Sequence, residues 1–532
     1  MNTKISVNCI MKIMNVLFLV VLENFIFDGG MGFFGTSFLV LSVIFYLFLG
    51  GLYNSIAKTV SIRKNKGLNC NAKHIIKPAL IYVLFVGFIM CILSFLFADK
   101  ITLKLWGISY SAPVIQLVCI ALIINAVVDV ICGYQNGNGN SVIVIITSIL
   151  RAVLPFVFAF FCVPVIIRYG EKVAALQKND VVISAYAALG VALVYVITML
   201  FVLIVTIALH IRMNVFQDDR KMLRSIDSKR AVMGGMIVSS VRISVNQIFP
   251  LASLAAVAAA YLRLAYKCGM KPESTFVNAG IIFGKLLLPI WFVFFIFSEY
   301  IAREKYKLHM DMRKDEHKTG AVRAQYMIKN SFFMLLPPTM ILTFLSDPIV
   351  KVFYSGQYII SAKFVKTGAF ILLFAGISYT LNSILKAIGK EINVLFIQFI
   401  SFILQMIFLI FMLSTTNGNS MNLIYSFYFF FGLQIILSSL MLYRYIRLNL
   451  MDILLKLGKY GASSIVMMVL FIILDKFIMM NVLLLLLSMF FGYLLYYLTL
   501  LALKGISKRD ETSLKYTLNY YPVKFLKSRL RM

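Results

Sequence analysis

The sequence predicts an all-α polytopic membrane protein with about fourteen transmembrane helices. Hydrophobic residues make up 61% of its 532 residues, whereas soluble domains contain roughly half. These residues are concentrated in continuous runs of about 20, which is the length of helix that spans the hydrocarbon core of a bilayer. The strands of a membrane β-barrel would instead alternate in polarity over about ten residues.

Each predicted helix is an apolar run bounded by polar or glycine-containing segments. The first run is expected to be a signal-anchor helix, because no small-residue cleavage site follows it and another span comes directly after it. Pro155, Pro250 and Pro289 are expected to bend the fifth, seventh and eighth helices. In order, the helices are predicted at residues 5–27, 33–57, 78–97, 113–133, 142–167, 181–210, 232–261, 276–301, 328–345, 364–388, 392–413, 423–442, 460–474 and 481–503.

Lysine and arginine residues cluster after even-numbered helices, in the loops that follow helices two, six, eight and twelve and in the C-terminal tail. Such clusters mark the cytoplasmic side of a membrane. We therefore expect a multi-pass protein of the cell membrane with both termini in the cytoplasm. This topology accounts for the net charge of +30. We expect no nucleic-acid partner, because no basic face with interleaved aromatic residues lies outside the apolar runs.

Two very short hairpin turns contain glycine, which suits a tight helix reversal because it tolerates positive φ. They are Gly133-Tyr-Gln-Asn-Gly-Asn-Gly-Asn140, after helix four, and Asn382-Ser-Ile-Leu-Lys-Ala-Ile-Gly389, after helix ten. Their equivalent positions in two six-helix blocks indicate a parallel repeat, with chance similarity as the alternative. The predicted parts are an N-lobe at 1–210, a cytoplasmic inter-lobe loop at 211–231, a C-lobe at 232–447, helices thirteen and fourteen within 448–504, and a basic cytoplasmic tail at 505–532.

Sequence motifs for catalysis are missing. The chain contains no P-loop, no HExxH motif and no GxSxG motif. Its seven cysteines form no CxxC pair and are typical of small hydrophobic residues, so no metal site is expected. The loops are too short to fold a catalytic domain. We expect a protein that is not an enzyme, although an integral membrane enzyme with its site inside the helices remains an alternative.

A few ionisable residues fall inside the predicted helices, where a charge is costly in lipid and should face a cavity, a partner or an interface. The cations are Lys12, Arg151, Arg242 and Lys285, and the anions include Glu23 and Asp129. The cations predict a cavity between the lobes that binds an anion such as pyrophosphate, because Arg offers a planar fork and Lys a compact charge. Alternatively, the cations reach an interface or pair with the carboxylates, or the carboxylates bind a coupling proton or sodium ion.

Several segments occur in an order and spacing that resemble one family. These segments are Gly29–Phe38 with Gly51–Val60, the basic loop Arg63–Lys77, the turn Gly133–Asn140, Leu287–Arg303 and Asp347–Gly356. They resemble the MOP (multidrug/oligosaccharidyl-lipid/polysaccharide) exporter superfamily, and within it the polysaccharide-transport branch of SpoVB-like, MurJ-like and Wzx-like proteins. Arg151 falls where many SpoVB-like sequences carry an arginine. The end of helix one, Glu23–Asp28, differs from MurJ-like members, which often place arginine there.

The resemblance implies two pseudo-symmetric six-helix lobes plus two C-terminal helices, and export of an undecaprenyl-pyrophosphate-linked saccharide by alternating access. That cargo would be lipid II-like or a polysaccharide repeat unit. The implied partners are this lipid-linked saccharide, membrane lipids, and glycosyltransferases or polymerases of the same pathway. No cofactor is expected apart from a coupling ion, H+ or Na+. The alternatives are a MATE-like cation-coupled drug antiporter, built on Glu23 and Asp129, and a non-transporting integral membrane enzyme or assembly scaffold.

Overall fold

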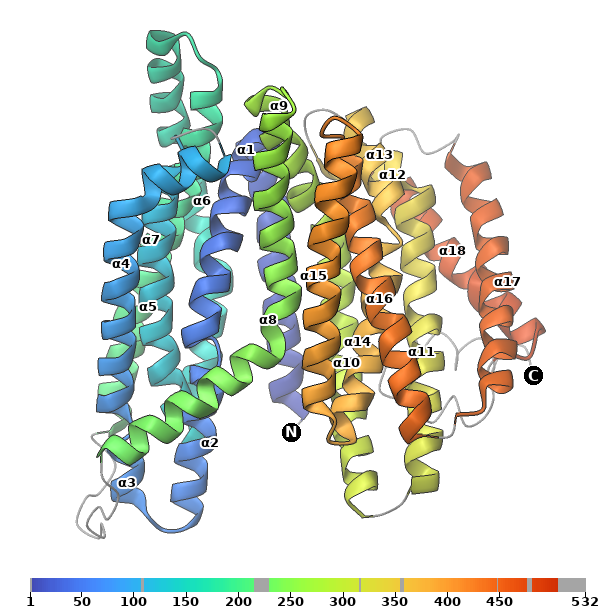
Figure 1. The fold of residues 1–532 in the computed structure, drawn as a ribbon, viewed down its shortest axis with the longest axis horizontal. Coiled ribbons are helices and arrows are strands. Elements are labelled where there is room, and N and C mark those ends of the chain that lie inside the picture. Colours follow the sequence, from blue (N-terminus) through green and yellow to red (C-terminus); the bar gives the residue numbers. More distant parts are fainter. Residues whose placement is uncertain are drawn as a thin grey trace. The chain divides into compact units, whose positions relative to one another are not determined.

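The computed structural model describes residues 2–106, 110–214, 229–314, 317–354, 358–446, 448–475 and 481–505. The secondary structure in these ranges is helical throughout, as predicted (Figure 1). The described residues contain thirteen helical spans that are long and apolar enough to cross a membrane. The first of them, Ile10–Asn65, covers most of the first predicted helix and all of the second, so it accounts for the difference from fourteen. The chain is a multi-pass membrane protein. Most of the predicted inter-lobe loop and of the basic tail lies outside the described residues.

The longest helix, α1 (Asn2–Leu49), is broken at Phe27, where φ is 56° and ψ is 176°. A straight helix of 48 residues would be about 72 Å long, more than twice the thickness of the hydrocarbon core. The break divides α1 into two parts that run in opposite directions in Figure 1. The first two predicted helices are therefore two separate helical segments, joined by one sharply bent residue.

One compact unit contains residues 1–280 and 410–420. In it, α6 and α7 pack along each other, α5 packs against α4 and α7, and α8 packs against α1, α2 and α4. Besides α1, its helices are α2 (Leu52–Asn65), α3 (Asn69–Lys73), α4 (Ile76–Trp106), α5 (Ala112–Gly137), α6 (Ser141–Gln177), α7 (Val181–Asn214), α8 (Lys229–Lys267) and α9 (Pro272–Gly280).

The second compact unit contains residues 281–409 and 421–532. Its central helix is α14, which contacts α10, α11 and α16, while α17 packs against α11 and α18. Its elements are the π-helix η2 (Ile281–Leu286), α10 (Leu287–Arg313), α11 (His317–Phe344), α12 (Ser346–Phe353), α13 (Tyr358–Gly368), α14 (Ile371–Ala387), most of α15 (Glu391–Thr415), α16 (Met421–Tyr445), α17 (Leu450–Asp475) and α18 (Val482–Ala502). The end of α15, from residue 410 onward, belongs to the first unit.

The division between these units falls at residues 280 and 281 rather than at the predicted inter-lobe loop. The reason is that α8 and α9 pack against α1. The contact is close: a Cβ atom added at Gly280 would collide with the carbonyl oxygen of Asp28, and one added at Gly32 would collide with that of Phe276. The predicted lobes, which were inferred from a repeat, stay a prediction.

The three prolines that are expected to bend helices all lie in helical segments. Pro155 lies inside α6, and Pro250 lies inside α8, which changes direction along its length in Figure 1. Pro289 lies just after η2, where six residues adopt π-helical geometry. In a π-helix the backbone hydrogen bonds join residues five apart in place of four, and such segments are frequent at functional sites.

The two predicted glycine turns are confirmed. Gly139 has φ of 87° and Gly389 has φ of 81°, and in both cases the next helix begins two residues later, at Ser141 and Glu391. The α5–α6 and α14–α15 hairpins are thus closed in the same way, which agrees with the internal repeat.

Candidate functional site

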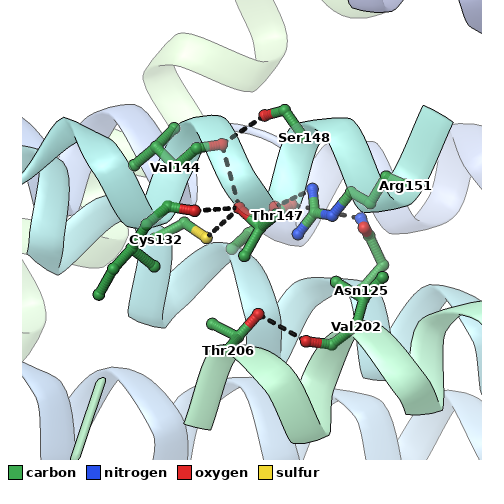
Figure 2. A network of polar contacts seen from close by, with 10 residues as sticks. Asn125, Cys132, Val144, Thr147, Ser148, Arg151, Val202 and Thr206 are labelled. Carbon is green, nitrogen blue, oxygen red and sulfur yellow. Dashed lines mark hydrogen bonds and ion pairs between the residues drawn. The ribbon is translucent and has the colours of Figure 1, made fainter. Parts of the chain in front are cut away.

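The clearest charged contact at membrane depth joins α5 and α6 (Figure 2). Arg151 Nη1 on α6 donates a hydrogen bond of 2.8 Å to Asp129 Oδ1 on α5. The second carboxylate oxygen, Oδ2, accepts a hydrogen bond of 3.3 Å from Asn125 Nδ2, one turn earlier on α5. The two charged side chains are 24% and 31% exposed. Arg151 therefore pairs with Asp129, which is one of the alternatives predicted for the cations in the membrane.

Polar side chains one turn along α6 hold the same two helices together. Thr147 Oγ1 lies 3.3 Å from Cys132 Sγ on α5 and donates to the carbonyl oxygen of Ile143 at 2.9 Å. Figure 2 shows these groups next to Arg151. Cys132 belongs to an apolar cluster with Val128 and Val202. The guanidinium is therefore positioned by a rigid hairpin, with an apolar core on one side.

Only part of the hydrogen-bonding capacity of Arg151 is used. Its Nε and Nη2 atoms have no hydrogen-bond partner among the residues that the structure describes. A guanidinium carries five N–H donors in a fixed fork, which suits planar oxyanions such as carboxylate and phosphate. Asp129 thus anchors one end of the fork and leaves donors for a further acceptor.

Lys285 is fully buried, with 0% exposure, and belongs to η2. Its Nζ donates a hydrogen bond of 3.3 Å to Ser361 Oγ on α13. The next residue, Leu286, packs against Gly368 at the end of α13. The predicted lysine is therefore inside the second unit, on the one π-helix among the described residues.

The other two predicted cations differ in their surroundings. Arg242 is exposed on α8, between Ser240 and Ser244, which face the start of α2. Ser244 Oγ accepts a hydrogen bond of 2.9 Å from the backbone N–H of Gly51. Lys12 is half-buried in α1. The structure brings Arg151 and Asp129 together, and the convergence of the other cations on one cavity stays a prediction.

Glu23, the second predicted carboxylate, is fully buried in α1, with 0% exposure. Asp28, five residues later and next to the break in α1, is 6% exposed. Glu23 is a site residue predicted from the sequence, but Asp28, which lies just beyond the predicted end of the first helix at residue 27, is not. The described ranges contain no group of three or more His, Cys, Asp or Glu side chains that could hold a metal ion.

Sequence reasoning also missed a buried cation in the second unit. Lys329 on α11 is 3% exposed and forms an ion pair with Asp452 on α17, whose side chain is 46% exposed. The available signal was a lysine near the start of an apolar run, without any indication of its partner. This pair ties α17 to the core of the unit.

Comparisons with known proteins identify the fold. The sequence matches no protein-family profile and no curated protein. An inward-facing MATE multidrug transporter of the MOP superfamily is similar with a TM-score of 0.60 at 14% identity, over 82% of this chain and 98% of that chain. The lipid II flippase MurJ, in an inward closed conformation, gives 0.59 at 13% identity over 93% and 96%. The MATE multidrug transporter DinF-BH gives 0.57 at 15% identity over 84% and 95%.

The chain therefore has the fold of the MOP-superfamily transporters, as the resemblance of its sequence segments led us to expect. At this level of identity the similarity defines the fold, and the cargo has to be argued from the chain's own residues. The two MATE structures match a smaller share of this chain than the flippase does.

Proposed function

We propose that this protein is a transporter that moves an undecaprenyl-pyrophosphate-linked saccharide across the cell membrane by alternating access. The observation that carries the proposal is how far the fold similarity extends. The helices up to α16 end before residue 450, and 449 of 532 residues is about 84% of the chain. The two MATE structures match 82% and 84% of the chain, whereas the flippase matches 93%. The flippase match therefore includes part of the segment after residue 449, which contains α17 and α18.

The chemistry of the charged residues supports an anionic head group. Arg151 is oriented by Asp129 and has donors to spare, and Lys285 supplies a compact charge inside the second unit. A pyrophosphate offers several oxygens to such groups, and charge-assisted hydrogen bonds to phosphate are among the stronger ones. Arg242, Lys12 and the predicted inter-lobe cavity complete the proposed site.

Binding of the head group would favour one arrangement of the transporter over another through differential contacts. The lipid tail would stay in the bilayer while the saccharide fills the cavity. A coupling ion, H+ or Na+, would reset the cycle. Protonation of Asp129 would weaken its hold on Arg151, so this carboxylate could link the coupling ion to the anion. Partner glycosyltransferases or polymerases of the same pathway are part of the proposal.

A ligand-induced shift in thermal unfolding tests the proposal. We expect the purified protein to be stabilised by an undecaprenyl-pyrophosphate saccharide, because a ligand that binds only the folded state raises its stability. Undecaprenol, which has the same tail and no phosphate, is the matched control and should produce a much smaller shift. Equal shifts with both lipids would show that the tail alone is recognised and would contradict the proposed anion site.

A MATE-like drug antiporter is the second candidate. Two carboxylates in the predicted transmembrane helices favour it, because a proton or sodium ion could couple through either of them. They are Glu23, which is buried, and Asp129, which is partly exposed. An efflux assay with a cationic dye distinguishes the two functions. Dye efflux that is lost in Glu23→Gln, together with no shift by the pyrophosphate lipid, would support the antiporter.

A non-transporting membrane enzyme or an assembly scaffold is a further alternative. The sequence contains no recognised catalytic motif, and the structural neighbours are transporters. In either role, the reconstituted protein would move neither the lipid-linked saccharide nor the dye.

A further inference from the structure

The ends of α10 and α14 that are predicted to face the cytoplasm lie beside each other in the second unit. Nδ1 of His309 on α10 is 3.0 Å from the carbonyl oxygen of Ala387, the last residue of α14. Deeper in the unit, Glu299 on α10 interacts electrostatically with Tyr379 on α14. The two helices, which pack against each other, therefore run side by side up to the glycine turn at Gly389.

Two half-buried lysines lie at this end of the helix pair. Lys305 lies one turn before His309 on α10, and Lys386 immediately precedes Ala387 on α14. The two lysines interact electrostatically with each other, and each interacts with Glu391 in the first turn of α15. The helix contacts thus hold two positive charges near one negative charge.

The other carboxylates at this end of α10 are engaged with a different group of cations. Glu304 accepts hydrogen bonds from Lys307 Nζ at 2.6 Å and from Arg323 Nη1 at 3.3 Å. Asp311 Oδ2 accepts one of 2.6 Å from Nε of the same arginine, which belongs to α11. Among the described residues, Glu391 is therefore the carboxylate that acts on both lysines.

The charge of the two lysines is only partly balanced. For Lys386, the repulsion by Lys305 outweighs the attraction by Glu391. Glu391 is also exposed, so water and salt screen its charge more than they screen partly buried groups. Two ammonium groups that are held together and partly removed from water favour a bound anion, because the anion lowers the free-energy cost of both charges.

We propose that Lys305 and Lys386 form a binding site for a phosphate group. A phosphate offers several acceptor oxygens, so it can accept hydrogen bonds from both ammonium groups at once, and lysine is a common phosphate ligand. A metal cation would add to the repulsion, so the sign of the charge selects an anion. The site goes beyond the proposed cargo site, since neither lysine belongs to that site.

Two sources can supply a phosphate group at this position. The predicted topology places both lysines near the cytoplasmic surface of the bilayer, where the head groups of anionic phospholipids attract basic side chains. Free phosphate from the cytoplasm has the same chemistry. In either case the bound group would connect α10 to the α14–α15 turn, in addition to the contact between His309 and Ala387.

Thermal unfolding of the full-length protein tests the site and identifies the source. One arm compares sodium phosphate with sodium chloride at equal ionic strength in detergent, and the other compares phosphatidylcholine vesicles with and without phosphatidylglycerol. We expect the unfolding temperature to rise by about 2 °C or more in at least one arm, because a ligand of the folded state stabilises it. A rise in the first arm identifies free phosphate, and a rise in the second alone identifies a lipid head group.

Variants assign the rise to these lysines. Lys305→Gln and Lys386→Gln should each abolish it, because either change removes one of the two ammonium groups. In chloride, Lys386→Gln should unfold at the wild-type temperature or above, since it removes a net repulsion, whereas loss of a lysine with only a structural role would lower that temperature. Lys318→Gln, at an exposed position on α11, is the matched control and should keep the full rise.

Arg151→Met should also keep the rise, because Arg151 belongs to the proposed cargo site, so failure of the lysine site leaves the proposed cargo untouched. Three results would overturn the lysine site. They are no rise in either arm, an equal rise in the wild type and both lysine variants, and a lowered unfolding temperature of Lys386→Gln in chloride. A rise that is lost in Arg151→Met and kept in the lysine variants would place the phosphate at the cargo site instead.

Discussion

Arg151 and Asp129 form an ion pair across the α5–α6 hairpin, with Nη1 of the arginine 2.8 Å from Oδ1 of the carboxylate. The hairpin turns at Gly139, so one residue lies ten positions before the turn and the other twelve positions after it. Adjacent antiparallel helices bring such residues to the same depth. The arginine is therefore not an isolated cation in the membrane, because Asp129 both balances its charge and orients its fork.

The first prediction concerns the stability of this pair. Asp129→Asn leaves a half-buried guanidinium without its counter-charge and should cost about 1–2 kcal/mol of unfolding free energy, between the values typical of exposed and buried pairs. Arg151→Met should cost a similar amount. Thermal unfolding of the two single variants and the double variant measures this. The double variant should be no less stable than the worse single one, and strictly additive losses would show that the pair is not energetically coupled.

The second prediction concerns the close contact of α9 with α1. Gly280→Ala places a methyl group against the carbonyl oxygen of Asp28, and backbone atoms cannot move aside as a flexible side chain can. We expect a loss of about 1–3 kcal/mol, as for other overpacked sites. Gly235→Ala, in α8, is the matched control because a Cβ there meets nothing within 4 Å. If both variants unfold at the same temperature, the contact is looser than described.

The third prediction concerns the buried Lys329. Lys329→Met removes the charge and keeps most of the volume, so it should change the unfolding free energy by less than about 1.5 kcal/mol. Asp452→Asn leaves the buried ammonium without its counter-charge and should therefore cost more. We expect about 1–3 kcal/mol, less than for a fully buried pair, because Asp452 itself is half-exposed. Denaturation of the two variants under identical conditions gives the order. The reverse order would mean that the lysine is held by other groups.

The fourth prediction concerns topology. Cys268 is exposed and follows the seventh predicted helix, so it should face the outside of the cell. In a variant whose other six cysteines are replaced by alanine, a membrane-impermeant maleimide should label Cys268 in intact cells. A cysteine introduced at Lys318, in the loop after the eighth predicted helix, should react only after permeabilisation. Labelling with the opposite pattern would invert the predicted orientation.

The spans could be predicted from sequence because lipid exposure imposes a length and a composition on each helix. The turns at Gly139 and Gly389 could be predicted because a tight reversal needs positive φ, and both glycines have it. The sequence offered the pairing of Arg151 with Asp129 only as an alternative. The hairpin turn at Gly139 places both residues at the same depth.

Other features depend on tertiary packing and leave no mark in the local sequence. The break at Phe27 falls on a residue with no preference for positive φ, and the π-helix of Lys285 cannot be recognised from composition. Lys329 and Asp452 are 123 residues apart, on helices whose contact no periodic pattern reveals. The packing of α8 and α9 against α1 also depends on tertiary contacts and could not be predicted from the local sequence.

The most direct test of the central claim is translocation by the purified protein in liposomes that contain a labelled undecaprenyl-pyrophosphate saccharide. We expect the wild type to move the lipid between leaflets. A charge-assisted hydrogen bond contributes about 1.5–3 kcal/mol, so Lys285→Met and the Arg151→Met/Asp129→Asn double variant should each lower the rate about tenfold or more. Lys329→Met, which removes a buried cation outside the proposed site, should keep the wild-type rate. Unchanged rates in both cation variants, or movement of a cationic dye in place of the lipid, would contradict a transporter that holds its cargo by the pyrophosphate.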